Sequence, residues 1–275
     1  MQNINKVAIN SLTLYLNMGV TMVVTLLATR LVLQILGEES YGVYALISSM
    51  VAMFSFLNVA MAAGTQRFLS YSIGEGDRKK LKEIFYSSIL IHLAIAVVIC
   101  VLMLTCGFYF VNNILEISPS LLGAACSVLI CMIFGILFTV VAVPYDAAMN
   151  AHEDIAMIAV INIIEALLKL GASVVIFWVE EHRLEVYAFF VLVAQFFSYF
   201  CKRWYSRANY EETHYRFHRL ENFALGRSML GFSGWNLIGA GCSIFRYQGV
   251  AVLLNAFFGL LVNTAYGVAQ QVNGF

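Results

Sequence analysis

The sequence predicts an all-α protein that crosses a membrane several times. Of its 275 residues, 61% are apolar and only 12% are charged, whereas a soluble domain has about 25% charged residues. Seven runs are long enough to cross a bilayer as helices, which takes ~20 mostly apolar residues. These continuous runs exclude barrel strands, in which apolar and polar residues alternate. The balance of 16 basic against 16 acidic residues also argues against a protein that binds nucleic acid.

The predicted helices follow one another with short connections. The sixth is the weakest, because its uncharged core covers only 186–201. Pro144, near the end of the fourth, is expected to kink or end that helix and to act as a hinge. The seven runs are 8–36, 41–64, 84–111, 121–145, 155–179, 184–205 and 229–257.

Basic residues are distributed unevenly between the two sides of the predicted bundle. Lys6 precedes the first run. Most other Lys and Arg residues lie between the second and third runs or between the sixth and seventh runs. On the opposite side we find only Arg183, beside acidic residues. The positive-inside rule therefore predicts a cytoplasmic N-terminus.

A short repeat predicts how the chain is divided. Tyr41-Gly42-Val43 recurs as Tyr266-Gly267-Val268, and each copy follows a long run and a short connection. Parallel repeats of this kind occur in two-lobe transporters. We expect an N-terminal lobe of six helices at 1–205, a cytoplasmic linker at 206–228 and the start of a second lobe at 229–275. The second lobe would then stop inside its second helix.

Charged residues inside the predicted helices are the candidate functional residues, because each costs at least ~2.5–3.5 kcal/mol at the centre of a bilayer. Glu165 and Lys169 are spaced i, i+4 and share a helix face, so they either neutralise each other or line a cavity. Arg30 either reaches the outer headgroups or faces a cavity. Arg246 lies mid-helix without an acidic residue on its own helix. An excess of cations suits an anionic substrate such as a phosphate or diphosphate.

Other chemistry has little support. Asp146 follows Pro144 near a helix end, so it is either solvated or, like Glu165, a candidate for ion coupling. His214 and His218 have the i, i+4 spacing of some metal sites, but Tyr215 stands where a zinc-protease motif needs Glu. The six cysteines lie in or beside apolar runs without a Cys-x-x-Cys pair. We therefore expect no enzyme activity, catalytic residue, metal or cofactor.

A series of short stretches stands out along the sequence. They are Arg30–Gly37 with Tyr41–Tyr44, Gln66–Leu69 with the loop to Lys82, Pro144–Ala147, Ile164–Leu170, Phe232–Asn236 and Leu253–Gly259. In their order and spacing, these stretches resemble bacterial polysaccharide transporters of the O-antigen and capsule type, which share a superfamily with multidrug-and-toxin extruders and lipid II flippases. The resemblance covers essentially the whole chain.

This resemblance implies two lobes around a central cavity that opens alternately to each side of the bacterial inner membrane. The cargo would be a polyprenyl-diphosphate-linked oligosaccharide, with a polysaccharide polymerase and glycosyltransferases as possible partners. Arg30, Lys169 and Arg246 would correspond to cations that line the cavity. The alternatives are a multidrug or metabolite antiporter of the same fold, a membrane-embedded glycosyl- or acyltransferase, and a scaffold that transports nothing.

Overall fold

The computed structural model describes residues 2–113, 117–214, 225–236, 238–239, 241–242 and 250. Every element in the described residues is helical, which confirms the predicted fold class. The long helices are α1 (Gln2–Ala52), α2 (Ser55–Glu75), α3 (Arg78–Leu102), α5 (Leu122–Ala151), α6 (Ile155–Val175) and α7 (Arg183–Asn209). The short ones are a π-helical turn at Met103–Gly107, α4 (Phe108–Asn113) and 3-10 turns at Ile176–Trp178 and Glu211–Thr213.

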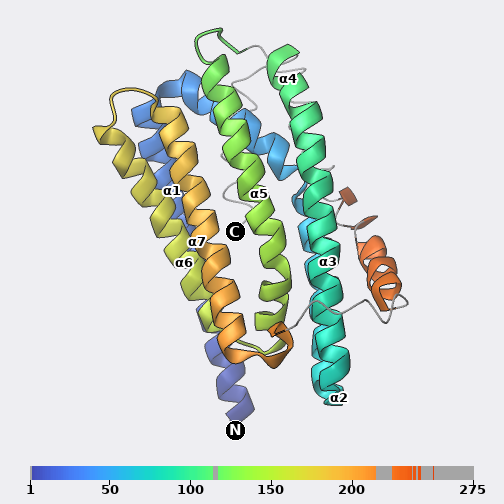
Figure 1. Cartoon of the computed structure of the whole chain (residues 1–275). Coiled ribbons are helices and arrows are strands. Elements are labelled where there is room, and N and C mark those ends of the chain that lie inside the picture. Colours follow the sequence, from blue (N-terminus) through green and yellow to red (C-terminus); the bar gives the residue numbers. More distant parts are fainter. Residues whose placement is uncertain are drawn as a thin grey trace.

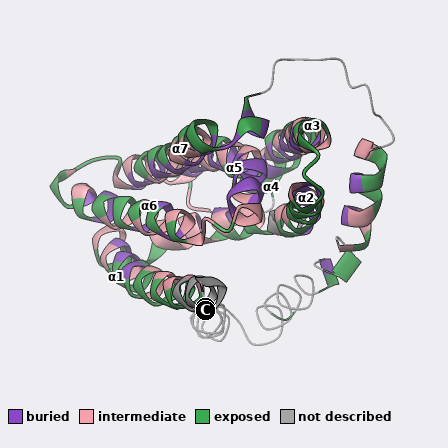
Figure 2. Ribbon diagram, turned by 90° about the horizontal axis from the view of Figure 1, so that it is seen from below, coloured by how far each residue is buried: buried purple, intermediate pink, exposed green. Residues whose placement is uncertain are grey.

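The long helices form a bundle with its polypeptide turns at two ends (Figure 1). The N-terminus and the end of α7 lie at one end, which we call the linker end because residues 210–214 follow α7 there. The α5 helix occupies the middle of the bundle, with α6 and α7 on one side and α2 and α3 on the other (Figure 2). The described part of the predicted first lobe is therefore a single packed unit around α5.

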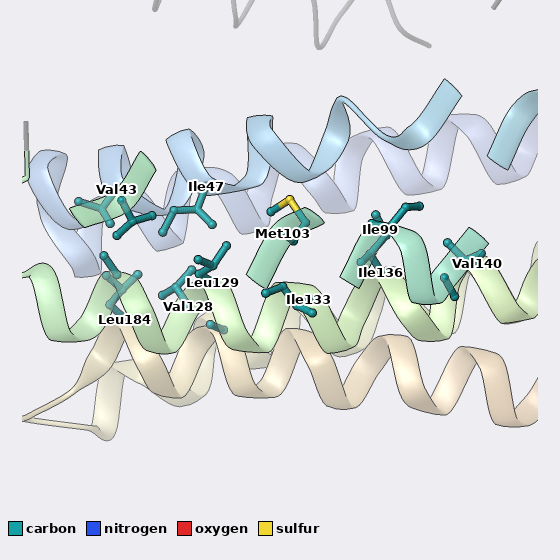
Figure 3. Packing of buried hydrophobic residues seen from close by; sticks show 14 residues of the cluster. Val43, Ile47, Ile99, Met103, Val128, Leu129, Ile133, Ile136, Val140 and Leu184 are labelled. Carbon is teal, nitrogen blue, oxygen red and sulfur yellow. The ribbon is translucent and has the colours of Figure 1, made fainter. Parts of the chain in front are cut away.

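The main core joins α5 to three neighbouring segments (Figure 3). Leu129 and Ile133 of α5 pack with Ile47 of α1, Ile99 of α3 and Leu184 of α7, and each of these side chains is almost completely buried. Branched and small apolar residues pack closely between helices, and such packing stabilises bundles within lipid. Many other large apolar residues are exposed on the outside of the bundle, as a bilayer-facing surface requires.

Five stretches among the described residues are long and apolar enough to cross a membrane: Asn10–Ala52, Arg78–Asn113, Leu122–Ala151, Ile155–Trp178 and Arg183–Asn209. The last four match the third to sixth predicted helices. The second predicted helix is divided instead, because its first part continues α1 and its remainder lies in α2 after a break at 53–54. Most of the seventh predicted helix and the second copy of the Tyr-Gly-Val repeat lie outside the described residues.

Gly37 separates α1 into two arms. Its backbone has φ 78° and ψ 170° in the middle of an otherwise helical segment. This region of backbone conformation is open essentially to glycine alone, because a Cβ atom collides with the adjacent peptide groups. The arm before Gly37 and the arm after it therefore run in different directions, and the second arm crosses towards α5 (Figure 1).

Replacing Gly37 by alanine is expected to lower the free energy of unfolding by about 1–3 kcal/mol, because alanine cannot adopt this conformation without strain. Gly42→Ala is the matched control, since Gly42 has no positive φ and no atom within 4 Å of an added Cβ. Thermal unfolding in detergent measures both. Equal melting temperatures for the two variants would contradict the strained bend.

The start of α3 and the last part of α5 lie at the linker end (Figure 1). Gly76 ends α2 in the left-handed conformation, and the Asp77 side chain then caps α3 by accepting a hydrogen bond from the Lys80 amide. Pro144 lies buried inside α5, which continues to Ala151, so the helix does not end at Pro144.

Candidate functional site

A polar cavity of about 670 Å³ lies between α1, α6 and α7. Both arms of α1 contribute to its wall, so the bend at Gly37 helps to form it. Most of the polar side chains that line it carry a hydroxyl or an amide. They are Asn17, Thr21, Thr25, Thr29, Tyr41, Tyr44, Ser48, Ser49, Asn162 and Tyr187.

One face of α1 supplies a regular row of these groups. Asn17, Thr21, Thr25 and Thr29 follow one another at intervals of four residues, which places them on one side of a helix. The Thr21 hydroxyl also donates a hydrogen bond to Asn17 Oδ1 over 3.2 Å. The sequence analysis missed the three threonines, although their spacing within an apolar run was a usable signal.

Glu165 and Lys169 of α6 form the ion pair that their spacing predicts, and both line the cavity. Lys169 Nζ lies 2.7 Å from Glu165 Oε1, and the two side chains are 35% and 21% exposed. The Ser198 hydroxyl of α7 adds a hydrogen bond to Glu165. Because one cation compensates one anion, the described lining of this cavity carries no net charge.

The other two predicted cavity cations have different positions. Arg30 is exposed on α1 and does not line this cavity. Arg246 lies outside the described residues. Of the two predicted cations that the structure describes, Lys169 lines the cavity and Arg30 does not.

Asp146 forms a second ion pair, closer to the linker end. Its Oδ2 atom lies 2.9 Å from Nζ of Lys202 on α7, and only 9% of Lys202 is exposed. Asp146 is thus paired rather than solvated, and Lys202 is buried within the bundle. The sequence did not indicate this partnership, because 56 residues separate the two groups.

The segment after α7 folds back onto the linker end as a clasp, which we define as residues 210–214 with the α5–α6 turn that they contact. Tyr210 stacks on His152 with ring centroids 4.2 Å apart, and its hydroxyl donates a hydrogen bond to Asp154 Oδ2. Burial, followed by this bond to Asp154, raises the pKa of Tyr210. His152 Nε2 lies 2.6 Å from Oε1 of Glu212, which is 2% exposed. This start of the predicted linker is a largely buried turn.

His152→Ala is expected to lower the free energy of unfolding by about 1–3 kcal/mol, because it removes a partner from the buried carboxylate of Glu212. Arg78→Ala is the control, since it breaks an exposed pair with the adjacent Glu211, and such pairs contribute about 0–1 kcal/mol. Denaturant unfolding in detergent measures both. A loss for Arg78→Ala that matches the loss for His152→Ala would show that the clasp contributes nothing specific.

The described helices thus form a bundle of long apolar segments with a polar cavity between α1, α6 and α7. The chain belongs to the MatE family, whose profile matches residues 11–175. The comparison with curated proteins finds no match.

Several solved structures have a similar fold. An outward-facing multidrug resistance MATE transporter has a TM-score of 0.78 at 13% identity, over 98% of this chain and 59% of that one. A MATE protein in complex with MaL6 gives 0.82 at 12% identity, over 97% and 59% of the two chains. A Pyrococcus furiosus transporter, described as having a binding pocket of reverse polarity that suggests a different function, gives 0.75 at 15% identity, over 97% and 60%.

This chain spans about 60% of the length of these structures. They are described as MATE or MOP transporters and not as polysaccharide flippases.

Proposed function

We propose that the chain supplies the first lobe of a two-lobe transporter that exports small polar organic molecules, as a multidrug or metabolite antiporter. The cavity carries this proposal. Its volume of about 670 Å³ falls within the range of roughly 300–1,000 Å³ that small-molecule sites occupy. Its internally compensated Glu165–Lys169 pair suits neutral or zwitterionic cargo better than strongly charged cargo. Glu165 is also the candidate for ion coupling in this lobe.

A second candidate is the export of a polyprenyl-diphosphate-linked oligosaccharide. The row of hydroxyl and amide groups on α1 favours it, since such groups hydrogen-bond to sugar hydroxyls. Lys169 would then attract the diphosphate together with Arg30 and Arg246, while the prenyl tail stays in lipid. A polymerase and glycosyltransferases would act beside this transporter.

For either cargo we propose the bacterial inner membrane with the N-terminus in the cytoplasm. Arg78, Lys79, Lys80 and Lys82 all lie at or near the start of α3, at the linker end. Basic residues flanking membrane helices favour the cytoplasmic side.

Expression of the full-length protein separates the two candidates. Drug accumulation is measured in cells that lack their own efflux pumps, and surface glycan is measured in cells that lack their own glycan flippase. Reduced drug accumulation without restored glycan supports the antiporter, and the reverse supports the glycan flippase. No change in either assay contradicts both.

A variant pair links the exported cargo to the cavity. Thr25→Val removes one cavity hydroxyl at nearly constant shape and is expected to weaken export. Leu27→Val is the control, because Leu27 is exposed on the same helix and does not line the cavity.

A further inference from the structure

The cavity changes in chemistry along its length. The first arm of α1 and the α6 helix both begin at the linker end and run in the same direction (Figure 1). Val32 of α1 and Ala172 of α6 belong to one buried cluster, so these two residues lie at a similar height in the bundle. Thr25 and Glu165 each come seven residues earlier in their helices, which is about 10 Å closer to the linker end. The residues that line the cavity can therefore be ordered by height.

The end of the cavity far from the linker end is aromatic. Tyr41 and Tyr44 follow the bend of α1, and Tyr187 lies near the start of α7. All three line the cavity, and all three pack in or against the cluster that contains Val32. The rings of Tyr44 and Tyr187 meet edge-on, with centroids 5.0 Å apart. We call these three tyrosines the tyrosine end of the cavity.

Hydroxyl groups of the tyrosine end already have partners in the cavity wall. The Tyr187 hydroxyl donates a hydrogen bond to Tyr44, and Tyr41 accepts one from the Thr29 hydroxyl. Since these polar groups are satisfied, the surface that the tyrosine end offers to a cargo is mainly that of its rings. Aromatic rings attract one another in stacked and edge-to-face arrangements. The tyrosine end therefore suits a cargo that carries an aromatic ring.

The Glu165–Lys169 pair lies between the tyrosine end and the linker end. Lys169 comes three residues before Ala172, about 4.5 Å along the helix, and Glu165 lies one turn further away. Asn17 and Asn162 line the cavity still nearer to the linker end. A cargo whose ring lies at the tyrosine end thus places its next atoms beside one cation and one anion.

This ion pair suits a cargo that carries both signs of charge. A cargo with an ammonium group alone pairs with Glu165 only by leaving Lys169 uncompensated, and a carboxylate alone does the same to Glu165. A zwitterion offers a partner to each residue, so neither charge is left alone. Partly buried charges without partners are costly, and the Glu165 and Lys169 side chains are only 21% and 35% exposed.

We propose that the cavity binds an aromatic zwitterion of the amino-acid type. Its ring packs against the tyrosine end, its carboxylate pairs with Lys169 and its ammonium group pairs with Glu165. The pair lies only one to two helical turns from the tyrosine end, so few atoms separate the ring from the charged groups. This assignment rests on the proposed function, because it names the substrate class of the same cavity.

Isothermal titration calorimetry of the purified full-length protein tests the assignment with four probes. L-tryptophan carries a ring, an ammonium group and a carboxylate. Tryptamine lacks the carboxylate, indole-3-propionate lacks the ammonium group and L-alanine lacks the ring. Each of these three is expected to bind at least roughly tenfold more weakly than L-tryptophan, because each leaves one part of the site without its partner. The proposal is overturned if L-tryptophan does not bind, or if any of the three binds as tightly.

Two variants link these preferences to the residues. Glu165→Gln combined with Lys169→Gln should abolish the preference for L-tryptophan over tryptamine but keep the preference over L-alanine. Tyr187→Leu should do the reverse, whereas Tyr187→Phe keeps the ring and should bind like the parent protein. Tyr109→Leu is the matched control, because Tyr109 is exposed and does not line the cavity. If both test variants keep both preferences, the probes bind elsewhere and the proposal is overturned.

Calorimetry requires no export, so its result is separate from the test of the proposed function. A protein that lowers drug accumulation but does not prefer L-tryptophan would contradict the aromatic zwitterion alone. A protein that prefers L-tryptophan but exports nothing would contradict the proposed function alone.

Discussion

Replacing Lys202 by alanine is expected to lower the free energy of unfolding by about 3–5 kcal/mol, the cost of leaving a buried charge without its partner. Lys202 Nζ is 2.9 Å from Asp146 Oδ2, and Asp146 Oδ1 is buried with no hydrogen-bond partner in the described part of the chain. Lys202 is thus the compensating cation that the structure gives this carboxylate. Since proteins are stable by only about 5–15 kcal/mol, the yield of folded protein in the membrane should also fall.

Two controls isolate burial as the cause. Lys80→Ala breaks an ion pair of nearly equal length, 2.8 Å to Glu75, in which both side chains are more than a third exposed, so its effect should be much smaller. Lys202→Met combined with Asp146→Leu removes both charges and should recover most of the stability, because apolar replacements of buried pairs are often neutral. A double variant as unstable as Lys202→Ala would refute this explanation.

Lys169→Ala is expected to lower export of an anionic cargo at least roughly tenfold. The substitution leaves the Glu165 carboxylate uncompensated in the cavity wall, and two like charges about 4 Å apart repel by roughly 4 kcal/mol at an effective dielectric constant of 20. Water in the cavity screens part of this repulsion. Export of a cationic drug should be maintained, since the same carboxylate attracts it.

Transport assays of Lys169→Ala should therefore show reduced export of an anionic cargo and maintained export of a cationic one. Lys169→Arg keeps the positive charge and should behave like the parent protein. Lys169→Gln combined with Glu165→Gln removes both charges and should relieve the repulsion. Unchanged export of an anionic cargo by Lys169→Ala would remove this ion pair from the transport mechanism.

Local sequence patterns predicted most of the fold. Long apolar runs indicate membrane helices because lipid offers no partner for backbone polar groups, and four of the apolar stretches match their predicted helices closely. The break at 53–54 was missed, since neither Met53 nor Phe54 is a helix breaker. It depends on packing between helices, which a local pattern does not contain.

The candidate site was predicted only where both partners lie on one helix. Glu165 and Lys169 could be paired from their spacing, and the structure confirms the pair. The Asp146–Lys202 and His152–Glu212 pairs join segments that the bundle brings together, so they could not be found from local spacing. The close approach of Ser233 to Gly64 could not be predicted for the same reason, because the two residues lie far apart in the sequence.

The bend at Gly37 also decides how membrane crossings should be counted. Asn10–Ala52 contains 43 residues, and at 1.5 Å per residue a straight helix of that length would be about twice as long as the ~30 Å hydrocarbon layer is thick. Among the described residues, counting it as one crossing gives five crossings and places the start of α1 and the end of α7 in opposite compartments. When the arm after Gly37 and α2 are counted together as one further crossing, the total is even. Both ends then fall in the same compartment, as their shared position in Figure 1 requires.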